Sequence, residues 1–158
     1  MMARRYIAPL EAEIEIDASP VAVWDVLHDQ RRMNEWSPET YKQVFVGSPL
    51  KAGTLSLNLN KRKAAVWPTL SRYREVVPAR RLAFHVYGPA ALWSYHLEPT
   101  ESGGTRVVER RRLVNDRAAI ASLVTARLML GGAESHDREI LEGMHTTLQR
   151  LKAEVESR

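Results

Sequence analysis

Residues 133–155 read AESHDREILEGMHTTLQRLKAEV, and this stretch decides the fold. Apolar side chains recur along it every three or four residues, which is the spacing of one stripe on an α-helix. The stripe consists of Ile140, Leu141, Met144, Leu148, Leu151 and Val155. A helix of this length is about 35 Å long, so its stripe needs a broad apolar surface to lie on. We expect the rest of the chain to supply that surface as a curved sheet.

Strand patterns dominate the chain before this helix. Residues 10–17 alternate apolar and acidic side chains without exception, which is typical of a strand with one buried face. Six further strands are expected at 41–46, 54–60, 66–77, 82–87, 92–98 and 105–114, separated by turn-forming residues. Because neighbours in sequence usually pair, we expect a sheet of six to seven strands built from antiparallel hairpins.

Two short helices are expected after the first strand. Ser19 suits the N-cap of the first helix and Pro20 its first helical position. A helical turn at 31–35 follows and ends before Pro38. A further apolar helix is expected at 118–130, with two glycines separating it from the long final helix. This order predicts one α+β domain that spans residues 1–158.

Composition places the chain among ordinary globular proteins. It has 158 residues, of which 44% are apolar and 27% charged. The absence of cysteine excludes disulfides, zinc–thiolate sites and thiol chemistry, and it fits a reducing compartment. We find neither the apolar run of a signal peptide nor an 18-residue apolar stretch. We therefore expect a cytoplasmic protein without a transmembrane segment.

Short motifs along the chain carry a resemblance to a known superfamily. They are Ile16-Asp17-Ala18-Ser19-Pro20, Val23-Trp24, Leu27, Asp29, Trp36-Ser37-Pro38, Glu75 with Val77-Pro78, Arg81-Leu82-Ala83-Phe84 and Gly103-Gly104-Thr105. With the element order, they resemble the START-like (SRPBCC, helix-grip) superfamily, and most of all its polyketide cyclase/dehydrase branch. The resemblance covers nearly the whole chain. It implies a sheet wrapped around the last helix and a cavity that holds lipids, polyketides or other apolar molecules. It assigns no catalytic residue, because the superfamily has no shared catalytic motif.

The strand pattern also predicts which side chains face the helix. A turn at 88–91 would set Val86 opposite Trp93 and Phe84 opposite Tyr95. Extending this register predicts two inner rows, Tyr73–Val86–Trp93–Glu109 and Glu75–Phe84–Tyr95–Val107. Such rows would form the apolar floor of a ligand pocket with a few polar groups. The alternative is that the aromatic rings fill a solid core.

Candidate site residues follow from these rows, the first helices and the helical roof. The predicted ligand-binding residues are Trp36, Trp67, Tyr73, Phe84, Val86, Trp93, Tyr95, Val107, Glu109, Met129, Ile140 and Met144. Glu109, Glu75 and Tyr73 are the candidates for catalysis, because a carboxyl group on an apolar floor has a raised pKa and can act as acid or base. The alternatives for the carboxylates are structural ion pairs with arginine, or an outward position of Glu109 after a one-residue slip.

Three functions remain open on these patterns. The first is binding of a hydrophobic small molecule, whether lipid, polyketide or aromatic metabolite. The second is a polyketide cyclase or dehydratase that uses the same cavity. The third is an interaction or nucleic-acid module built on Arg106, Arg110 and Arg112, in a chain of net charge +4. We expect the first, in a monomer or homodimer with no metal, no cofactor and no nucleic-acid partner.

Overall fold

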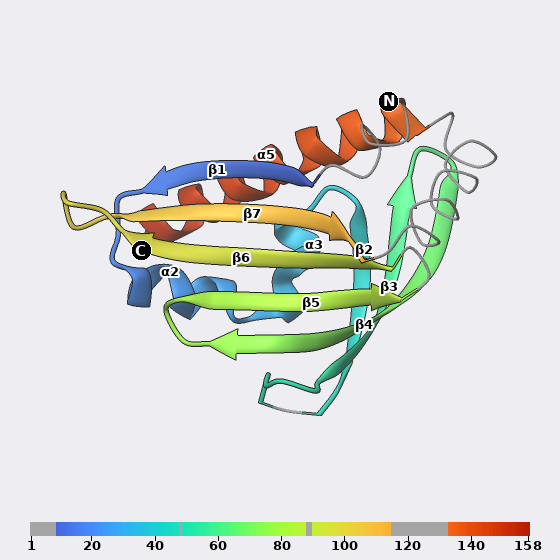
Figure 1. The fold of residues 1–158 in the computed structure, drawn as a ribbon, viewed down its shortest axis with the longest axis horizontal. Coiled ribbons are helices and arrows are strands. Elements are labelled where there is room, and N and C mark those ends of the chain that lie inside the picture. The colour runs from blue at the N-terminus through green and yellow to red at the C-terminus, as the bar shows by residue number, and fades with distance from the viewer. Residues whose placement is uncertain (1–8, 48, 88–89, 115–132) are drawn as a thin grey trace.

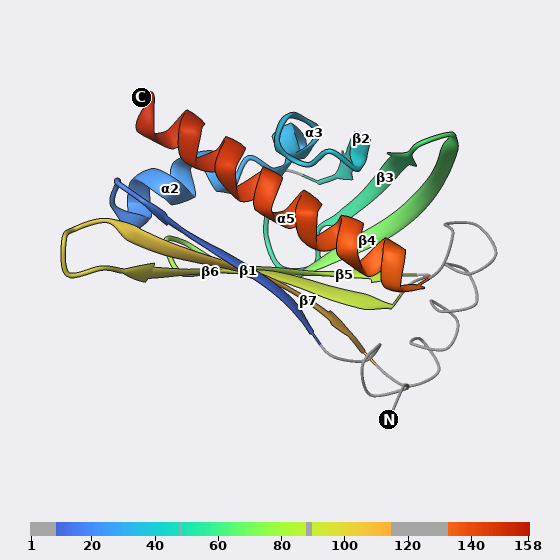
Figure 2. The ribbon, with the colours of Figure 1, turned by 90° about the horizontal axis from the view of Figure 1, so that it is seen from above.

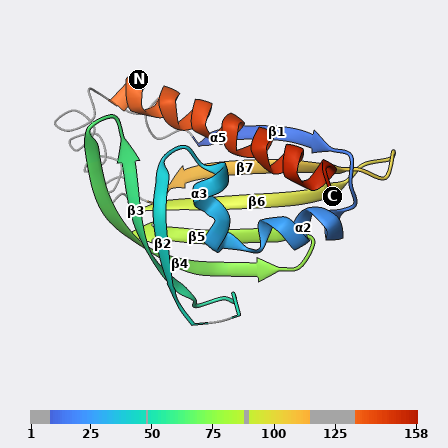
Figure 3. The same ribbon diagram turned by 180° about the vertical axis from the view of Figure 1, so that it is seen from behind.

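A seven-stranded antiparallel sheet with helices on one face makes up the fold (Figure 1). The computed structural model describes residues 9–47, 49–87, 90–114 and 133–158. The helices lie behind the sheet in Figure 1 and in front of it in Figure 3, so one face of the sheet is inner and the other is outer. The helix expected at 118–130 lies outside the described residues.

The elements occur in the predicted order. The strands are β1 (Leu10–Ile16), β2 (Thr40–Val46), β3 (Leu55–Arg62), β4 (Ala65–Val77), β5 (Arg81–Tyr87), β6 (Ala91–Pro99) and β7 (Thr105–Leu113). The helices are α2 (Pro20–Leu27), the 3-10 turn η1 (Gln30–Arg32), α3 (Met33–Trp36) and α5 (Ala133–Glu156). Along the sheet the order is β1-β7-β6-β5-β4-β3-β2, so sequential hairpins pair and β1 joins the far side of β7. The expected helix-grip fold is confirmed.

The long helix α5 crosses the inner face of the sheet, and β3 and β4 bend out of the plane of the other strands (Figure 2). Its predicted stripe is buried at Ile140, Met144, Leu148, Leu151 and Val155. The C-terminal half of α5 packs with α2 and with the inner residues of β1, β6 and β7 in one core. Burial of this apolar stripe is the main contribution to holding α5 on the sheet, because most of the stability of a helix in a protein comes from the packing of its apolar face.

The pairing registers differ from the predicted ones, although the predicted inner face is right. Phe84 lies opposite Trp93, and Tyr95 lies opposite Glu109. The β5–β6 ladder ends at Val86 opposite Ala91, whereas the prediction set Val86 opposite Trp93. The turn at 100–104 is closed by the Thr100 N–H, which donates to the Gly104 carbonyl at 3.0 Å. Each of these two ladders is displaced by two residues, and a shift of two keeps every side chain on its face.

A bulge in β4 explains why Glu75, which was predicted in an inner row, does not lie on the inner face. The register shifts between Tyr73 and Glu75, and such a bulge re-aims the side chains that follow it. The Glu75 side chain is 42% exposed and forms an ion pair with Arg81 at 3.0 Å. Its predicted place in an inner row is therefore wrong, and the alternative of a structural ion pair applies, with Arg81 as the partner.

Candidate functional site

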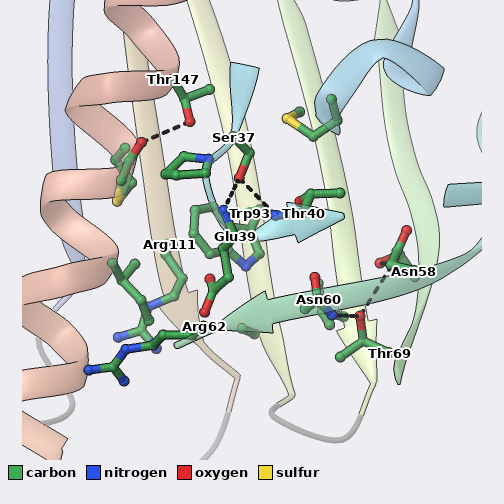
Figure 4. A pocket seen from close by; sticks show the side chains of 18 of the residues that line it. Ser37, Glu39, Thr40, Asn58, Asn60, Arg62, Thr69, Trp93, Arg111 and Thr147 are labelled. Carbon is green, nitrogen blue, oxygen red and sulfur yellow. Dashed lines mark hydrogen bonds between the residues drawn. The ribbon is translucent and has the colours of Figure 1, made fainter. Parts of the chain in front are cut away.

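A cavity of about 710 Å³ lies between the inner face of the sheet and the N-terminal half of α5 (Figure 4). Strands β2 to β7 supply its floor and far wall, α3 and residues 37–39 a second wall, and α5 its roof. This volume is in the range of pockets that enclose a small organic ligand. The sheet curves enough to leave this space because α5 packs closely only on the strands at the β1 side.

Most predicted ligand-binding residues meet at this cavity. The residues that line it are Trp67, Tyr73, Phe84, Val86, Trp93, Tyr95, Glu109, Ile140 and Met144. Two others belong to the solid core instead: the Trp36 ring N–H donates to Glu154 Oε2 at 2.8 Å, and Val107 lies fully buried opposite Leu97. Met129 lies outside the described residues.

Aromatic rings form one wall of the cavity. Trp93, Phe84 and Tyr73 lie side by side across three strands, and the ring centroids of Tyr73 and Phe84 are 5.3 Å apart. The Tyr73 hydroxyl donates to Gln30 Oε1 at 3.0 Å, and Gln30 in turn donates to the Leu27 carbonyl. Burial raises the pKa of Tyr73. This hydroxyl is therefore already engaged in a hydrogen bond within the protein. Tyr73 contributes the surface of its ring to the cavity rather than an acid or a base.

Glu109 supplies a carboxyl group at the deep end of the cavity. Only 2% of the residue is exposed, and its Oε1 accepts a hydrogen bond from the Tyr95 hydroxyl at 2.9 Å. The other oxygen, Oε2, is buried and has no hydrogen-bond partner among the described residues. Burial raises the pKa of Glu109 to about 8, although the hydrogen bond from Tyr95 opposes the shift. At neutral pH the carboxyl is thus mostly protonated and able to donate from Oε2.

Both alternatives for Glu109 can be compared with this geometry. It points inward, and the outer position goes to its neighbour Arg110, which is exposed. The inward arginine of β7 is Arg111, which lies opposite Trp93 and bonds Asp137 Oδ1 at 2.9 Å. Glu109 is therefore neither turned outward nor paired with Arg111.

A polar wall on β3 and β4 continues the inner face beside the aromatic wall, and its residues are not among the predicted ligand-binding residues. Asn58 is its centre: its amide nitrogen donates to Ser71 Oγ at 2.8 Å and to Thr69 Oγ1 at 3.3 Å. Its amide oxygen accepts from Ser56 at 2.9 Å and from Gln43 at 3.1 Å. The signal was present in residues 54–60, TLSLNLN, where every second residue is polar. The register of β3 on β4 sets those polar residues beside Thr69 and Ser71.

This polar wall presents hydroxyl protons to the cavity. Thr69 Oγ1 accepts from Asn58 and also from Asn60, the latter at 2.9 Å. Ser71 Oγ accepts from Asn58. A hydroxyl that accepts in this way still has its own proton to donate, and no described residue accepts one from Thr69 or Ser71. The wall is thus suited to a ligand that carries acceptor oxygens.

Charged side chains close one end of the cavity. Arg62 of β3 pairs with Glu139 of α5, and Arg111 of β7 pairs with Asp137. Glu39 lies beside the two arginines (Figure 4). Burial raises the pKa of Glu39, and the charges of Arg62 and Arg111 oppose that shift. These ion pairs attach the first turns of α5, before the buried Ile140, to the sheet.

The arginines considered for nucleic-acid binding lie on the outer face of β7. Arg106 pairs with Glu13 of β1 and, at 3.0 Å, with Glu98 of β6. Arg110 pairs with Glu11 at 2.6 Å. Carboxylates of the adjacent strands thus neutralise two of the three arginines, and only the exposed Arg112 has no ion-pair partner among the described residues, which disfavours the stripe as a surface for phosphate groups.

Two further observations concern metals and membranes. In the described ranges, no three His, Asp or Glu side chains are close enough together to hold a metal ion. No helix of the described residues has both the length and the apolar content needed to cross a membrane.

The fold has counterparts among known proteins. The family model for polyketide cyclase/dehydrase and lipid transport proteins matches residues 8–156. No curated protein sequence matches the chain significantly. Among solved structures, TTHA0849 from Thermus thermophilus is 18% identical, covers 95% of this chain and 98% of its own, and has a TM-score of 0.72. The Zhui aromatase/cyclase from Streptomyces sp. R1128 is 18% identical, with coverage of 96% and 94% and a TM-score of 0.69. Ara h 8.0201 is 12% identical, with coverage of 96% and 99% and a TM-score of 0.66. Identities this low indicate a shared fold only.

Proposed function

The chain belongs to the polyketide cyclase/dehydrase and lipid transport family, and from that premise we propose that it binds an apolar small molecule between the sheet and α5. One observation carries the proposal. The cavity of about 710 Å³ is lined by an aromatic wall on β4 to β6 and, beside it, by a wall of hydroxyl donors on β3 and β4. A cavity that served only as imperfect packing would not need a built polar wall, since buried polar groups cost free energy unless they are bonded.

The two walls favour one class of ligand. Trp93 and Phe84 offer flat surfaces on which a ring system stacks. Thr69 and Ser71, which lie beside these rings on the same inner face, offer protons to oxygens at an edge of the same ligand. A saturated acyl chain would leave these donors without partners, which is costly in a closed site. The pocket therefore suits an aromatic or polycyclic molecule with carbonyl or hydroxyl oxygens better than a simple fatty acid.

Two measurements test this proposal. Native mass spectrometry of freshly purified protein detects a ligand that co-purifies. Titration with emodin, a hydroxylated anthraquinone, and with palmitic acid, followed by tryptophan fluorescence, compares the two classes. We expect emodin to bind at least about tenfold more tightly, since each unpaired buried donor costs about 1 kcal/mol or more. Binding of palmitic acid alone would contradict the ligand class, and binding of neither with no co-purified molecule would contradict the proposed function.

A matched set of hydroxyl variants locates the ligand. Thr69→Val combined with Ser71→Ala removes the two free donors, and we expect weaker emodin binding. Thr147→Val is the control, because the Thr147 hydroxyl also lines the cavity but already donates to the Gly143 carbonyl at 2.8 Å. Equal effects of the two changes would show that the free protons do not contact the ligand.

Glu109 supports a second candidate function, which is proton transfer to the bound molecule. Its Oε2 is buried without a partner among the described residues, and its raised pKa keeps a proton available near neutral pH. A cyclisation or dehydration in the cavity would use such a donor, with Tyr95 as the positioning residue. If a substrate is turned over, the rate should fall above pH 8 and Glu109→Gln should abolish it while emodin still binds. A rate that survives Glu109→Gln would remove Glu109 from the mechanism.

A further inference from the structure

The outer face of β2, β3 and β4 is unusually apolar for a surface. Its exposed side chains include Val44, Val46, Leu57, Val66 and Leu70, whose exposed fractions lie between 42% and 66%. Val44, Leu57 and Leu70 are direct neighbours across the three strands. Contiguous exposed apolar side chains on a protein surface commonly mark an interaction site.

The same part of the chain carries only positive charge. Residues 40–74 contain seven of the 23 Lys and Arg residues and none of the 19 Asp and Glu residues, so the remainder of the chain has a net charge of −3. Lys42, Lys61 and Arg72 surround the apolar side chains on the outer face, by their register on β2, β3 and β4. Within the described part of the chain, none of these three has an ion-pair partner. Arg106 and Arg110 on the outer face of β7, by contrast, pair with glutamates.

We propose that the outer face of β2, β3 and β4 docks on an anionic membrane surface. Valine and leucine side chains at the centre would enter the boundary between headgroups and acyl chains, and the surrounding cations would contact lipid phosphates. The proposal concerns the outer face of the sheet and is independent of what the cavity holds.

The distribution of charge favours an anionic membrane over a second copy of the chain and over nucleic acid. In a symmetric dimer formed through this face, the same patch of each copy meets its partner, so unpaired cations would lie against cations or against leucines. A nucleic-acid surface would need cations across its centre, where phosphate contacts form, whereas the centre here is Val44, Leu57 and Leu70. An apolar centre with a cationic edge complements an anionic bilayer.

The charged end of the cavity adjoins this outer face. Lys61, Arg62 and Lys63, at the end of β3 and just beyond it, line the cavity, and Lys61 belongs to the outer face as well. A protein docked through this face would hold the charged end of its cavity close to the lipid surface. An apolar ligand could then pass between bilayer and cavity without crossing bulk water.

The test is flotation of the full chain with vesicles of phosphatidylcholine alone and of phosphatidylcholine mixed with phosphatidylglycerol. We expect binding to the mixed vesicles, weak binding to the neutral ones, and loss of binding at high salt. Lys42→Gln combined with Arg72→Gln should weaken binding about thirtyfold, because each cation near an anionic surface contributes about fivefold. Leu57→Thr combined with Leu70→Thr should weaken it about tenfold or more, while preserving strand propensity.

Control variants remove the same groups from other surfaces. Arg31→Gln removes a cation whose side chain is 75% exposed on η1, on the helix side of the sheet. Val21→Thr changes a 60% exposed valine on α2. Both controls should bind the mixed vesicles as the unchanged protein does. Trp93→Ala should also bind normally, so that loss of the cavity ligand and loss of docking are distinguishable.

Each other outcome contradicts the proposal. Equal binding to neutral and anionic vesicles, or binding unchanged in both double variants, would show that this face does not recognise anionic lipid. No vesicle binding together with a concentration-dependent dimer that Leu57→Thr disrupts would identify a second copy as the partner. No vesicle binding together with steeply salt-dependent binding to an oligonucleotide would identify nucleic acid. Absence of all binding would leave the patch without a partner and overturn the proposal.

Discussion

Strands β1 and β3 alternate equally strictly, but in opposite senses. In β1 the apolar residues point inward, as at Ala12 and Ile16, and the glutamates point outward. In β3 the polar residues point inward, as at Ser56 and Asn58, and Leu57 is 54% exposed on the outer face. Alternation therefore determines which residues share a face, and the surroundings determine which face is inner. The C-terminal half of α5 covers β1, whereas β3 borders the cavity.

The largest expected difference between the two regions comes from placing an aspartate on each. Leu148 of α5 is 1% exposed above the β1 side of the sheet, so Leu148→Asp buries an unpaired charge and should cost about 5 kcal/mol or more. Leu57→Asp on the outer face of β3 should cost about 1 kcal/mol or less. Thermal unfolding followed by circular dichroism measures both. Similar melting temperatures for the two variants would contradict the assignment of Leu148 to the buried core and of Leu57 to the outer face.

Two tryptophans test the same division at smaller magnitude. Trp36 is 2% exposed in the solid core, so Trp36→Ala should cost about 3–5 kcal/mol. Trp93 lines the cavity, so Trp93→Ala enlarges an existing space and should cost about 1–2 kcal/mol while weakening ligand binding. Urea denaturation compares them. A full core-sized loss for Trp93→Ala with unchanged ligand binding would favour the alternative that the aromatic rows are only packing.

Stability should depend on pH through Glu109. The folded protein holds this proton up to about pH 8, whereas the unfolded chain loses it near the ordinary pKa of 4.5. Folding is therefore penalised progressively as the pH rises through that window, by roughly 3 kcal/mol between pH 5 and pH 8. Glu109→Gln should remove this slope and leave stability at pH 5 nearly unchanged. A variant with the same slope as the unchanged protein would show that Glu109 titrates normally.

The smallest effect is expected on the outer face of β1. Glu13 pairs with Arg106, and both side chains are about half exposed. Glu13→Gln should cost less than about 1 kcal/mol, and added salt should reduce even that difference. Denaturation at low and high salt measures it. A loss of several kcal/mol would mean that the ion pairs on this face contribute to stability as much as the inner packing.

The sequence predicted the elements closely because their patterns are local. Alternation identified β1 to β7 with ends correct to within about two residues, and the Ser19-Pro20 start of α2 is as expected, with Ser19 Oγ accepting from the Ala22 N–H. The predicted registers were displaced, since the bulge after Tyr73 and the turn at 100–104 depend on backbone geometry that alternation does not encode.

The site was predicted on its aromatic side and missed on its polar side. Trp93, Phe84 and Tyr95 are bulky residues on a face that was already assigned as inner. The alternation around Asn58 was not recognised as part of the site, because leucines on the opposite face of β3 are the usual choice for a core. Pairing in space also determined that Arg111 meets Asp137, more than 20 residues further along the chain, and no local pattern connects the two.

The two attachments of α5 imply that its ends open at different rates. Buried Leu148, Leu151 and Val155 fix the second half of the helix, so their amides should exchange hydrogen only when the whole domain unfolds. The first turns, before the buried Ile140, are attached by Asp137 and Glu139 to arginines of the sheet. Their amides should exchange through local opening, and faster as salt screens those pairs. The first turns of α5 would then open and close over the cavity while the rest of the helix stays packed. The time that they spend closed would depend on ionic strength rather than on the free energy of unfolding of the whole domain.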